Sequence, residues 1–503
     1  MKISITRLTL FLSIFLTLFD NWAYYQHVLE IYPAILKNSG FLMSIVILQF
    51  FLTNLILILI NSKYIFKPAF ILILFLSASA AYFMDSYNAI IDGSMINNIL
   101  STDVAEASDL FSFKLLGYLF FLAVLPTYFI AKTTVPELSL WQSTISRLKL
   151  LGFSVLMIVL IIYIFSNFYS SFFREHKSIR FYSNPLYYIY SSSKYMGKKL
   201  MDSDQPLKEI GVDAHIPSTD THRELIIFVV GETARADRFS LNGYSRETNP
   251  LLKKEDVISL TNFWSCGTST AVSVPCMFFI VNTSEFDIGK TRSTENVLDV
   301  LKHAGVNLIW LDNNSSSKGV ADRIDYQSYK GSDINTECDL ECRDIGMLEN
   351  LQAYIDGHPQ GDIFIVLHQM GQHGPAYYKR YPSEFEKFTP VCKTNQLENC
   401  SNEELNNTYD NAILYTDYFL SKTIKLLKRN DAAFETAMFY VSDHGESLGE
   451  NGLYLHGLPN FIAPDSQRHV PAIIFLGKNM VDDIDLKEIK QDKSKRYSHD
   501  NLF

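Results

Sequence analysis

The chain has 503 residues, a formal net charge of −10 at pH 7 and 48% hydrophobic residues. These averages hide two unlike halves, because the sequence is mostly apolar before about residue 173, whereas charged and turn residues are frequent after it. The contrast excludes a uniformly soluble chain. It predicts a membrane domain followed by a water-exposed domain.

Five apolar segments of the first half are long enough to cross about 30 Å of hydrocarbon as helices. They are residues 8–28, 41–60, 68–84, 115–131 and 150–173. The first is the weakest because Asp20 interrupts it, although the aromatic residues that follow are typical of a membrane interface. A cleaved signal peptide is the alternative for this segment, since Lys2 and Arg7 precede it, but no small-residue cleavage site follows.

The placement of lysine and arginine predicts the orientation of these spans. Basic residues gather at 2–7, 63–67 and 132–149, whereas the loop 85–113 contains neither lysine nor arginine. The basic side is expected to be cytoplasmic, so five spans would export everything after residue 173. The sequence therefore predicts a multi-pass protein of the bacterial inner membrane with its second half in the periplasm.

All six cysteines lie in the part expected to be exported. They are Cys266 and Cys276, Cys338 and Cys342, and Cys392 and Cys400. Six cysteines allow many pairings, but their grouping into three close pairs favours three local disulfides and an oxidising compartment. The alternative, a cysteine zinc site, requires a CxxC-type spacing that this sequence lacks.

The water-exposed half begins with a mixed segment and continues as an α/β pattern. Residues 174–223 combine tyrosines with lysine and arginine, which suits either the membrane surface or an ordinary polar linker. From residue 224, apolar runs typical of buried strands alternate with helical patterns. The expected strands are 225–230, 306–311, 363–367, 437–441 and 470–476, and the expected helices are 297–303 and 407–428. This alternation predicts a mostly parallel central sheet covered on both faces.

Polar residues follow four of the predicted strands, where an open α/β sheet binds its ligands. They are Glu232 after the first strand, 312–314 after the second, His368 and His373 after the third, and 442–446 after the fourth. Taken alone, Glu232 is compatible with a helix-capping carboxylate and a histidine with a satisfied core side chain. Their coincidence at several strand ends is the stronger evidence for a site.

Glu232, Asp443 and His444 together supply two carboxylates and an imidazole, a ligand set that Zn²⁺ takes at near-tetrahedral geometry. A hydroxyl at such a metal is activated as a nucleophile without a separate base. The stretch FWSCGTSTAVSVPCMF, residues 263–278, offers four hydroxyl residues between two cysteines. A covalently closed loop would position one of them, but the residues alone do not select among Thr268, Ser269, Thr270 and Ser273.

Four long motifs resemble the lipid A phosphoethanolamine transferases, a family that includes the mobile colistin-resistance enzymes. The motifs are GETARADRFSLNGYSRETNPLL (231–252), SCGTSTAVSVPCMF (265–278), GQHGPAYYKRYP (371–382) and SDHGESLGENGLYLHGLP (442–459). The resemblance covers essentially the whole chain. It implies a five-helix transmembrane domain at 1–173, an interfacial linker at 174–223 and a periplasmic catalytic domain of alkaline-phosphatase-like fold at 224–503.

The resemblance also implies roles for the matching positions. Thr270 matches the nucleophile that carries phosphoethanolamine as a covalent intermediate, and with Glu232, Asp443 and His444 it completes the coordination of one zinc ion. His373 and His456 match histidines that hold the phosphoryl group, bind a second metal or assist proton transfer. Lys318 matches a lysine at the phosphoryl group, where a point charge suits the phosphoryl oxygens.

In the export-side loop, Asn98, Thr102 and Glu106 are spaced i, i+4 and i+8, so they share a face if a helix runs near 92–112. This resembles the helix of the family that receives the amine-bearing headgroup, with Glu106 as the partner of the ammonium. The alternative is a solvated polar face on a loop helix.

Two departures from the family pattern stand out. Some relatives flank the lysine with a disulfide, whereas Ser317 and Ala321 occupy the flanking positions here, so this loop is expected to be looser. The chain ends at SHDNLF, where the family usually continues, so a truncated C-terminus is expected.

The expected function is zinc-dependent transfer of phosphoethanolamine from phosphatidylethanolamine to lipid A, with resistance to polymyxin as its consequence. The expected partners are these two substrates and membrane lipids, with no nucleic acid. Transfer to core sugars is the alternative acceptor, and a phosphoglycerol transferase or a sulfatase-like enzyme is the alternative activity. A non-catalytic membrane binding protein that kept the scaffold is the alternative from another class.

Overall fold

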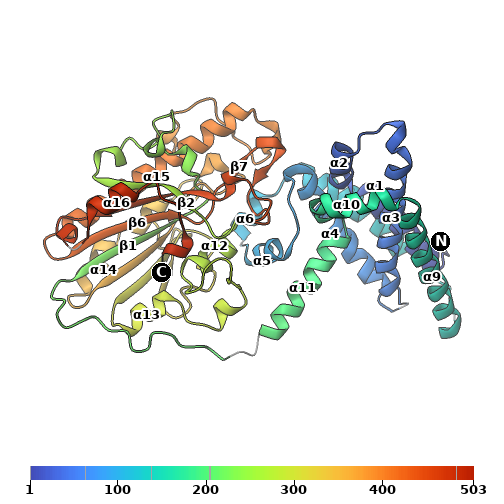
Figure 1. The fold of residues 1–503 in the computed structure, drawn as a ribbon, viewed down its shortest axis with the longest axis horizontal. Helices are drawn as coiled ribbons and strands as arrows, with labels where there is room; N and C mark the ends of the chain where they lie inside the picture. Colours follow the sequence, from blue (N-terminus) through green and yellow to red (C-terminus); the bar gives the residue numbers. More distant parts are fainter. Residues whose placement is uncertain are drawn as a thin grey trace. The chain divides into compact units, whose positions relative to one another are not determined.

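The structure, a computed structural model, describes residues 2–62, 64–102, 104–136, 139–202, 206–482 and 484–502. The chain divides into two compact units (Figure 1). The first, called here the membrane unit, combines Met1–Ile96 with Phe111–Met196. The second, the catalytic unit, combines Asn97–Leu110 with Gly197–Phe503.

Within the described part of the membrane unit, four helices are long and apolar enough to cross a membrane. They are Leu36–Leu59 (α3), Phe66–Tyr87 (α4), Phe113–Lys132 and Trp141–Ile164. The third is continuous through α7 (Phe113–Tyr118), η1 (Leu119–Val124) and α8 (Leu125–Lys132). The fourth lies in α9 (Leu140–Ile164), which ends well before residue 173 and is followed by α10 (Ser166–Glu175).

The expectation of five spans is wrong at the first segment. This segment forms two helices, α1 (Ile5–Phe19) and α2 (Trp22–Ile31), which are separated by Asp20 and Asn21. At this break the carbonyl of Thr17 accepts from the hydroxyl of Tyr25 at 2.9 Å, and the side-chain amide of Asn21 donates at 2.9 Å to the carbonyl of Leu16, which also accepts from the backbone N–H of Asp20. Fifteen helical residues extend about 22 Å, which is shorter than the hydrocarbon core.

Where one helix was predicted near 92–112, the structure has two, α5 (Gly93–Ser101) and α6 (Val104–Asp109). The face expected to carry Asn98, Thr102 and Glu106 is therefore not continuous. The side chain of Glu106 lies outside the described part of the structure. After the last span, the turn Lys177–Tyr182 leads to α11 (Leu186–Asp202); the boundaries expected for a linker at 174–223 stay a prediction.

The described catalytic unit is built on an eight-stranded sheet of order β10-β2-β9-β6-β1-β5-β3-β4. The strands are β1 (Glu224–Gly231), β2 (Val257–Trp264), β3 (Asn307–Asp312), β4 (Asp325–Ser328), β5 (Ile363–His368), β6 (Glu435–Ser442), β9 (His469–Leu476) and β10 (Tyr497–Ser498). All five predicted strands are confirmed, whereas β2, β4 and β10 were missed. The sheet is mixed, because β9 runs antiparallel to both β6 and β2. The segment between β6 and β9 contains the small hairpin β7 (Ser447–Leu448) and β8 (Tyr454–Leu455).

Helices cover both faces of this sheet (Figure 1). They are α12 (Thr270–Met277), α13 (Val297–His303), α14 (Leu351–Gly357), α15 (Asn402–Asn430) and α16 (Leu486–Asp492). Alternate residues of β1 point to opposite faces: Ile227 joins a core cluster with residues of α15, whereas Val230 joins another with residues of α12 and α13. This two-sided burial explains why the central strand is a nearly continuous apolar run.

The ends of four central strands lie level with one another. Val230 of β1 pairs with His368 of β5, which in turn pairs with Asp312 of β3, and Gly231 pairs with Ser442 of β6. The polar residues that follow these strands are therefore brought to one edge of the sheet, as the sequence predicted.

Candidate active site

Four side chains from distant parts of the chain meet at this edge. Ligand atoms of Glu232, Asp443 and His444 all lie within 4.8 Å of one another, and all three residues are buried. The hydroxyl oxygen of Thr270 lies 3.2 Å from Oε2 of Glu232 and 3.5 Å from Nε2 of His444. These are the four residues that the sequence predicted as metal ligands.

Glu232 is held by a tight turn directly after β1. The next residue, Thr233, has a φ of 54°, in a left-handed region that costs free energy for a branched side chain. Gly371 packs against this turn with a φ of 54°, and a Cβ atom there would lie 2.7 Å from the carbonyl oxygen of Glu232. Asn314, which follows β3, donates from its side-chain amide to Oε2 of Glu232 at 2.7 Å. The carboxylate is thus fixed by backbone geometry and by one amide.

Thr270 is the first residue of α12, with Ser269 at its N-cap. Disulfide Cys266–Cys276 closes the loop and the helix into one covalent ring. Among the neighbouring hydroxyls, that of Thr268 donates to the carbonyl of Leu458 at 2.6 Å, and that of Ser273 is buried without a hydrogen bond among the described residues. The geometry therefore separates Thr270 from Thr268 and Ser273, which the sequence alone did not.

The protonation of His444 makes the cluster suitable for a cation. Its Nδ1 donates to the carbonyl of Gly445 at 2.9 Å, and burial lowers the pKa of the imidazole well below its usual range, so the ring is neutral with its lone pair on Nε2. That lone pair faces Oε1 of Glu232 at 3.4 Å and Oδ2 of Asp443 at 3.3 Å.

Lone pairs that face one another repel unless a cation lies between them. Burial raises the pKa of Asp443 to about 6, and its Oδ2 makes no hydrogen bond among the described residues. Two carboxylates, a neutral imidazole and a hydroxyl form an oxygen and nitrogen donor set that fits a divalent metal such as Zn²⁺.

His373 and His456 extend the cluster as the sequence suggested. The ring centroid of His456 lies 4.3 Å from that of His444 and 5.4 Å from that of His373. Nδ1 of His456 lies 3.3 Å from Oε1 of the fully buried Glu446, a carboxylate that orients the ring. The imidazole rings of His444, His456 and His373 thus form a row that begins within the four-residue cluster.

Lys318 lies beside this cluster rather than in it. Its φ is 53°, and its ammonium group donates to Oγ and to the carbonyl of Ser315, at 2.7 and 2.9 Å. Ser315 follows Asn314, the residue that contacts Glu232. Lys318 therefore contacts the loop that holds Glu232 through Ser315, the residue next to Asn314.

Among the described residues, Asn98 and Thr102 make no hydrogen bond to the four-residue cluster. The hydroxyl of Thr102 donates to the carbonyl of Asn98 at 2.9 Å, which closes the C-terminal end of α5. The ammonium group of Lys318 also reaches the carbonyl of Ser101, at 3.4 Å. The segment 97–110 thus belongs to the catalytic unit, while the roles expected for Asn98, Thr102 and Glu106 stay predictions.

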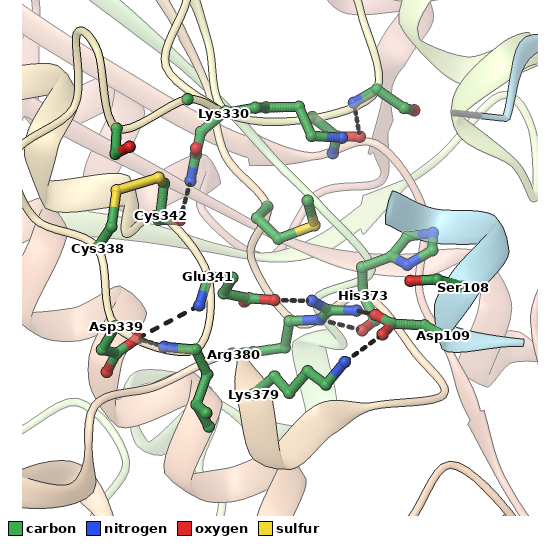
Figure 2. Close-up of a pocket in the computed structure, with 17 residues that line it drawn as sticks. Ser108, Asp109, Lys330, Cys338, Asp339, Glu341, Cys342, His373, Lys379 and Arg380 are labelled. Atoms are coloured by element: carbon green, nitrogen blue, oxygen red, sulfur yellow. Dashed lines mark hydrogen bonds and ion pairs between the residues drawn. A yellow bond between two sulfur atoms is a disulfide. The ribbon is translucent and has the colours of Figure 1, made fainter. Parts of the chain in front are cut away.

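A cavity of about 520 Å³, lined mostly by polar and charged residues, lies beside the cluster (Figure 2). Asn314, which contacts Glu232, and His373 form part of its wall, whereas the four cluster residues themselves do not line it. Acidic and basic side chains make up much of the remainder: Asp109, Lys330, Asp339, Glu341, Lys379 and Arg380. A cavity of this size and polarity suits a small polar substrate group rather than an acyl chain.

Asp344 is an organising residue that the sequence did not single out. Its carboxylate accepts from the side-chain amide of Asn313 at 2.7 Å and from the backbone N–H groups of Met370 and Gly371 at 2.8 and 3.2 Å. Burial raises the pKa of this carboxyl, while the bond from Asn313 opposes the shift. The residue joins the loop after β3 to the loop that carries His373. No local pattern marks it, because its partners are distant in sequence.

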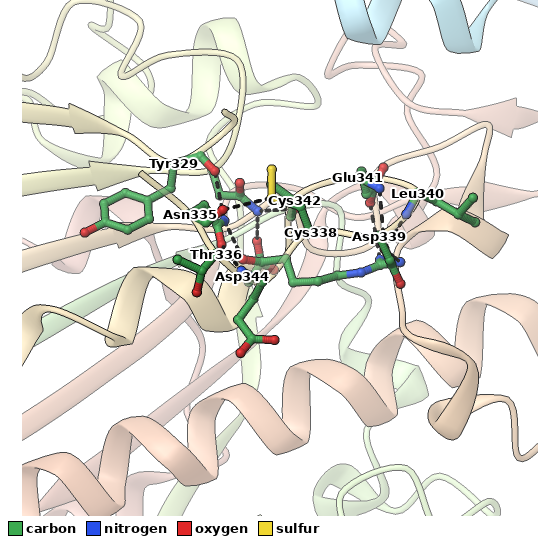
Figure 3. Close-up of a disulfide and its surroundings, with 12 residues drawn as sticks. Tyr329, Asn335, Thr336, Cys338, Asp339, Leu340, Glu341, Cys342 and Asp344 are labelled. Carbon is green, nitrogen blue, oxygen red and sulfur yellow. Dashed lines mark hydrogen bonds and ion pairs between the residues drawn. A yellow bond between two sulfur atoms is a disulfide. The ribbon is translucent and has the colours of Figure 1, made fainter. Parts of the chain in front are cut away.

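The three disulfides expected from the cysteine spacing are present: Cys266–Cys276, Cys338–Cys342 and Cys392–Cys400. The second directly precedes Asp344 and holds the turn that contains Glu341 (Figure 3). The side-chain amide of Asn335 supports this turn by donating to the carbonyls of Tyr329 and Arg343 at 2.9 and 3.0 Å.

The mixed sheet and the cluster at its edge define an alkaline-phosphatase-like enzyme domain. Consistent with this, the family model described as Sulfatase matches residues 224–503. A second model, Phosphoethanolamine transferase EptA/EptB, matches residues 49–200. The chain belongs to the phosphoethanolamine transferase family and is an enzyme of that class.

Individual relatives support this assignment along the whole chain. Phosphatidylethanolamine transferase Mcr-2 of Escherichia coli is 43% identical over 478 residues, which cover 92% of this chain and 88% of the relative. Phosphoethanolamine transferase EptA of E. coli K12 is 41% identical over 495 residues, which cover 96% and 90%. The structure of the integral membrane lipooligosaccharide phosphoethanolamine transferase A of Neisseria meningitidis matches with a TM-score of 0.94 at 34% identity, over 100% of this chain and 94% of that one.

Proposed function

We propose that this enzyme moves phosphoethanolamine from phosphatidylethanolamine to lipid A in two steps, with Thr270 as the covalent carrier. The observation that carries the proposal is the position of the Thr270 hydroxyl, 3.2 Å from Glu232 and 3.5 Å from His444 at the start of a buried helix. A hydroxyl that is buried among two carboxylates and a neutral imidazole is poised for activation by a cation.

Glu232, Asp443, His444 and Thr270 would hold one zinc ion, and their donor types fit that choice. When bound, the metal supplies Lewis acidity, which lowers the pKa of the threonine hydroxyl and offsets charge on the phosphoryl oxygens. His373 and His456 would bind a second ion or transfer a proton.

In the first step, Oγ1 of Thr270 forms a bond to the phosphorus of phosphatidylethanolamine. The bond from phosphorus to the glycerol oxygen breaks, and the hydroxyl proton ends on the departing diacylglycerol. In the second step, an acceptor oxygen forms a bond to the same phosphorus, the bond from phosphorus to Oγ1 of Thr270 breaks, and the proton of the acceptor passes to Oγ1. His456, whose Nδ1 lies 3.3 Å from Glu446, would pass these protons.

The substrate headgroup would be held by polar groups outside the wall of the cavity described above. Lys318 would supply a positive charge near the phosphoryl oxygens, and Asn98, Thr102 and Glu106 would face the ethanolamine. Phosphoryl transfer depends mainly on positioning and electrostatics, so these polar groups are sufficient for the role.

Core sugars are the second candidate acceptor. The Kdo(2)-lipid A phosphoethanolamine 7''-transferase of E. coli K12 is 30% identical over 279 residues, which cover 54% of this chain and 47% of that one. The higher identity and fuller coverage of the EptA and Mcr relatives favour lipid A.

We also propose that the enzyme lies in the inner membrane with its catalytic unit in the periplasm. Three disulfides support an oxidising compartment. The periplasmic domain of phosphoethanolamine transferase EptC from Campylobacter jejuni, 45% identical with a TM-score of 0.52 over 59% of this chain and 90% of that one, agrees with this placement.

The deciding experiment is mass spectrometry of lipid A from a polymyxin-sensitive Gram-negative host that expresses the chain, beside a Thr270→Ala control. The proposal expects lipid A to gain the mass of phosphoethanolamine in the first strain only, together with reduced polymyxin susceptibility, because the added ammonium lowers the negative surface charge. A gain on core sugars alone would select the second acceptor. Unmodified lipopolysaccharide beside a correctly inserted, oxidised protein would refute both.

A further inference from the structure

Arg380 contacts three different parts of the catalytic unit with one buried guanidinium. Its Nε donates to the backbone carbonyl of His373 at 2.6 Å, its Nη2 to Oδ2 of Asp109 at 2.7 Å, and its Nη1 to Glu341. Only 3% of its side chain is exposed. The guanidinium group of Arg380, called here the fork, is planar and permanently charged. Because it donates to three acceptors at once, it fixes the positions of these acceptors relative to one another.

Asp109 is the contact through which the segment 97–110 is held to this fork. Its Oδ1 accepts from Nζ of Lys379 at 2.5 Å, and its backbone carbonyl accepts from the side-chain amide of Asn395 at 2.6 Å. Burial acts against the charged carboxylate, but Arg380 and Lys379 outweigh it and lower the pKa of Asp109. In sequence the segment lies between two candidate spans, yet its anchoring residue is 271 positions away from Arg380.

Glu341 is fixed from the other side. It lies in the turn closed by Cys338–Cys342, whose next element begins with Asp344 (Figure 3). Figure 2 shows Asp109, Glu341 and Lys379 arranged around Arg380, with His373 next to Ser108 of α6. The fork therefore connects α6, the disulfide turn and the loop of His373.

We propose that Arg380, clamped by Asp109 and Glu341, is a positioning residue that sets the place of His373 in the catalytic row of imidazoles. The segment 97–110 is then part of the active-site structure, since its Asp109 completes the clamp. The expected effect on kcat rests on the proposed function, whereas the expected effect on the position of His373 does not.

The physical reason is the short path from the clamp to the chemistry. The carbonyl that Arg380 holds belongs to His373 itself, and the His373 ring lies 5.4 Å from that of His456, which lies 4.3 Å from that of His444. A displacement of about 1 Å in a group that assists transfer costs up to about a hundredfold in rate. Loss of the clamp should therefore lower kcat far more than it raises KM.

The test uses the full-length enzyme in proteoliposomes with phosphatidylethanolamine and lipid A. The variants are Asp109→Asn, Asp109→Glu, Arg380→Lys and the double variant Asp109→Asn with Arg380→Lys. The matched control is Arg323→Lys, which alters a part-buried fork to Asp299 with bonds of 2.8 and 2.5 Å. Each variant is measured for kcat, KM, melting temperature and amide hydrogen exchange in residues 371–374.

The inference expects kcat to fall about ten- to a hundredfold in Asp109→Asn and in Arg380→Lys, with KM within about threefold. The double variant should lose no more than the worse single one, because both remove the same contact, and Asp109→Glu should recover most of the rate. Arg323→Lys should lower the melting temperature without changing kcat. Additive losses in the double variant, or lower melting temperatures at unchanged kcat, would overturn the inference.

Hydrogen exchange separates this inference from the proposed function. Faster amide exchange of residues 371–374 in Asp109→Asn, with no such change in Arg323→Lys, supports the clamp even if lipid A is not the acceptor. Unchanged exchange in an enzyme that modifies lipid A would refute the clamp and leave the proposed function standing.

Discussion

The hydroxyl oxygen of Thr270 lies 3.5 Å from Nε2 of His444, although 174 residues separate the two in sequence. One residue begins a helix and the other follows the end of β6. The contact between them brings the N-terminus of α12, where backbone N–H groups favour negative charge, next to the carboxyl end of β6, where sheets of this kind bind their ligands. Both would favour the negatively charged phosphoryl group that the proposed function places on Thr270.

The carrier role of Thr270 predicts a sharp contrast among neighbouring hydroxyls. Thr270→Ala should reduce transfer at least about a thousandfold, because no carrier remains. Thr270→Ser keeps the hydroxyl and should retain measurable transfer. Thr268→Ala removes only the bond to Leu458, so it should cost about 1 kcal/mol of stability and leave transfer largely intact. Lipid A mass spectrometry in matched strains measures all three. Equal activity of the Ala and Ser variants at position 270 would contradict the role.

The donor set predicts one tightly held zinc ion for each chain. Elemental analysis of the purified protein should find zinc near one equivalent in the wild type and much less in Asp443→Asn. Chelation should abolish transfer and lower the melting temperature, and a zinc concentration a hundred times the Kd should restore about 2.7 kcal/mol of stability. The chelated Asp443→Asn protein should not respond to added zinc. A wild type that melts identically with and without chelator would contradict the site.

The ring closed by Cys266–Cys276 predicts a kinetic effect beyond stability. Replacing both cysteines by serine opens a loop of sequence separation 10 and should cost about 3 kcal/mol of unfolding free energy in the chain-entropy model. Replacing Cys392 and Cys400, of separation 8, should cost a similar amount. Only the first change should also lower kcat, because only that loop carries Thr270. Denaturant unfolding and transfer assays of the two variants check this; equal kcat in both would show that the ring has no positioning role.

Asp417 predicts a pH-dependent part of the stability of the catalytic unit. It is 1% exposed and accepts the N–H groups of Leu251 and Leu252, and burial raises its pKa to about 7. Because the pKa is raised on folding, the protonated carboxyl stabilises the folded state fully below about pH 4, and this contribution is lost as the pH rises through about 7. The shift of about three units sets an upper bound of about 4 kcal/mol.

Asp417→Asn remains neutral throughout this range and tests the effect. The stability of the variant relative to the wild type should rise between pH 4 and 7, as measured by melting of the full chain in detergent. A difference that does not vary with pH would contradict the raised pKa.

The central strands and three of the cluster residues could be predicted from the sequence, because buried parallel strands have a continuous apolar pattern and their polar ends must meet. The selection of Thr270 came from resemblance, since four hydroxyls in one short loop are equivalent in sequence. The structure separates Thr268 and Ser273 from Thr270. The first span was predicted wrongly because the helix breaks at Asp20 and Asn21, whereas hydrophobicity alone would continue it. Arg380 could not be predicted, because its acceptors lie in three segments that no local pattern connects.

The contacts of Arg380 also determine how a fragment of this enzyme without its membrane helices would differ from the intact protein. A soluble version that begins after the last membrane helix would keep Arg380 and Lys379 but lose Asp109, the carboxylate that both of them contact. Two basic groups would then face the cavity without that partner, and the cavity would become more cationic. Such a fragment should attract free phosphate and other small anions more strongly than the intact enzyme does, so its ligand preferences would misrepresent those of the complete protein.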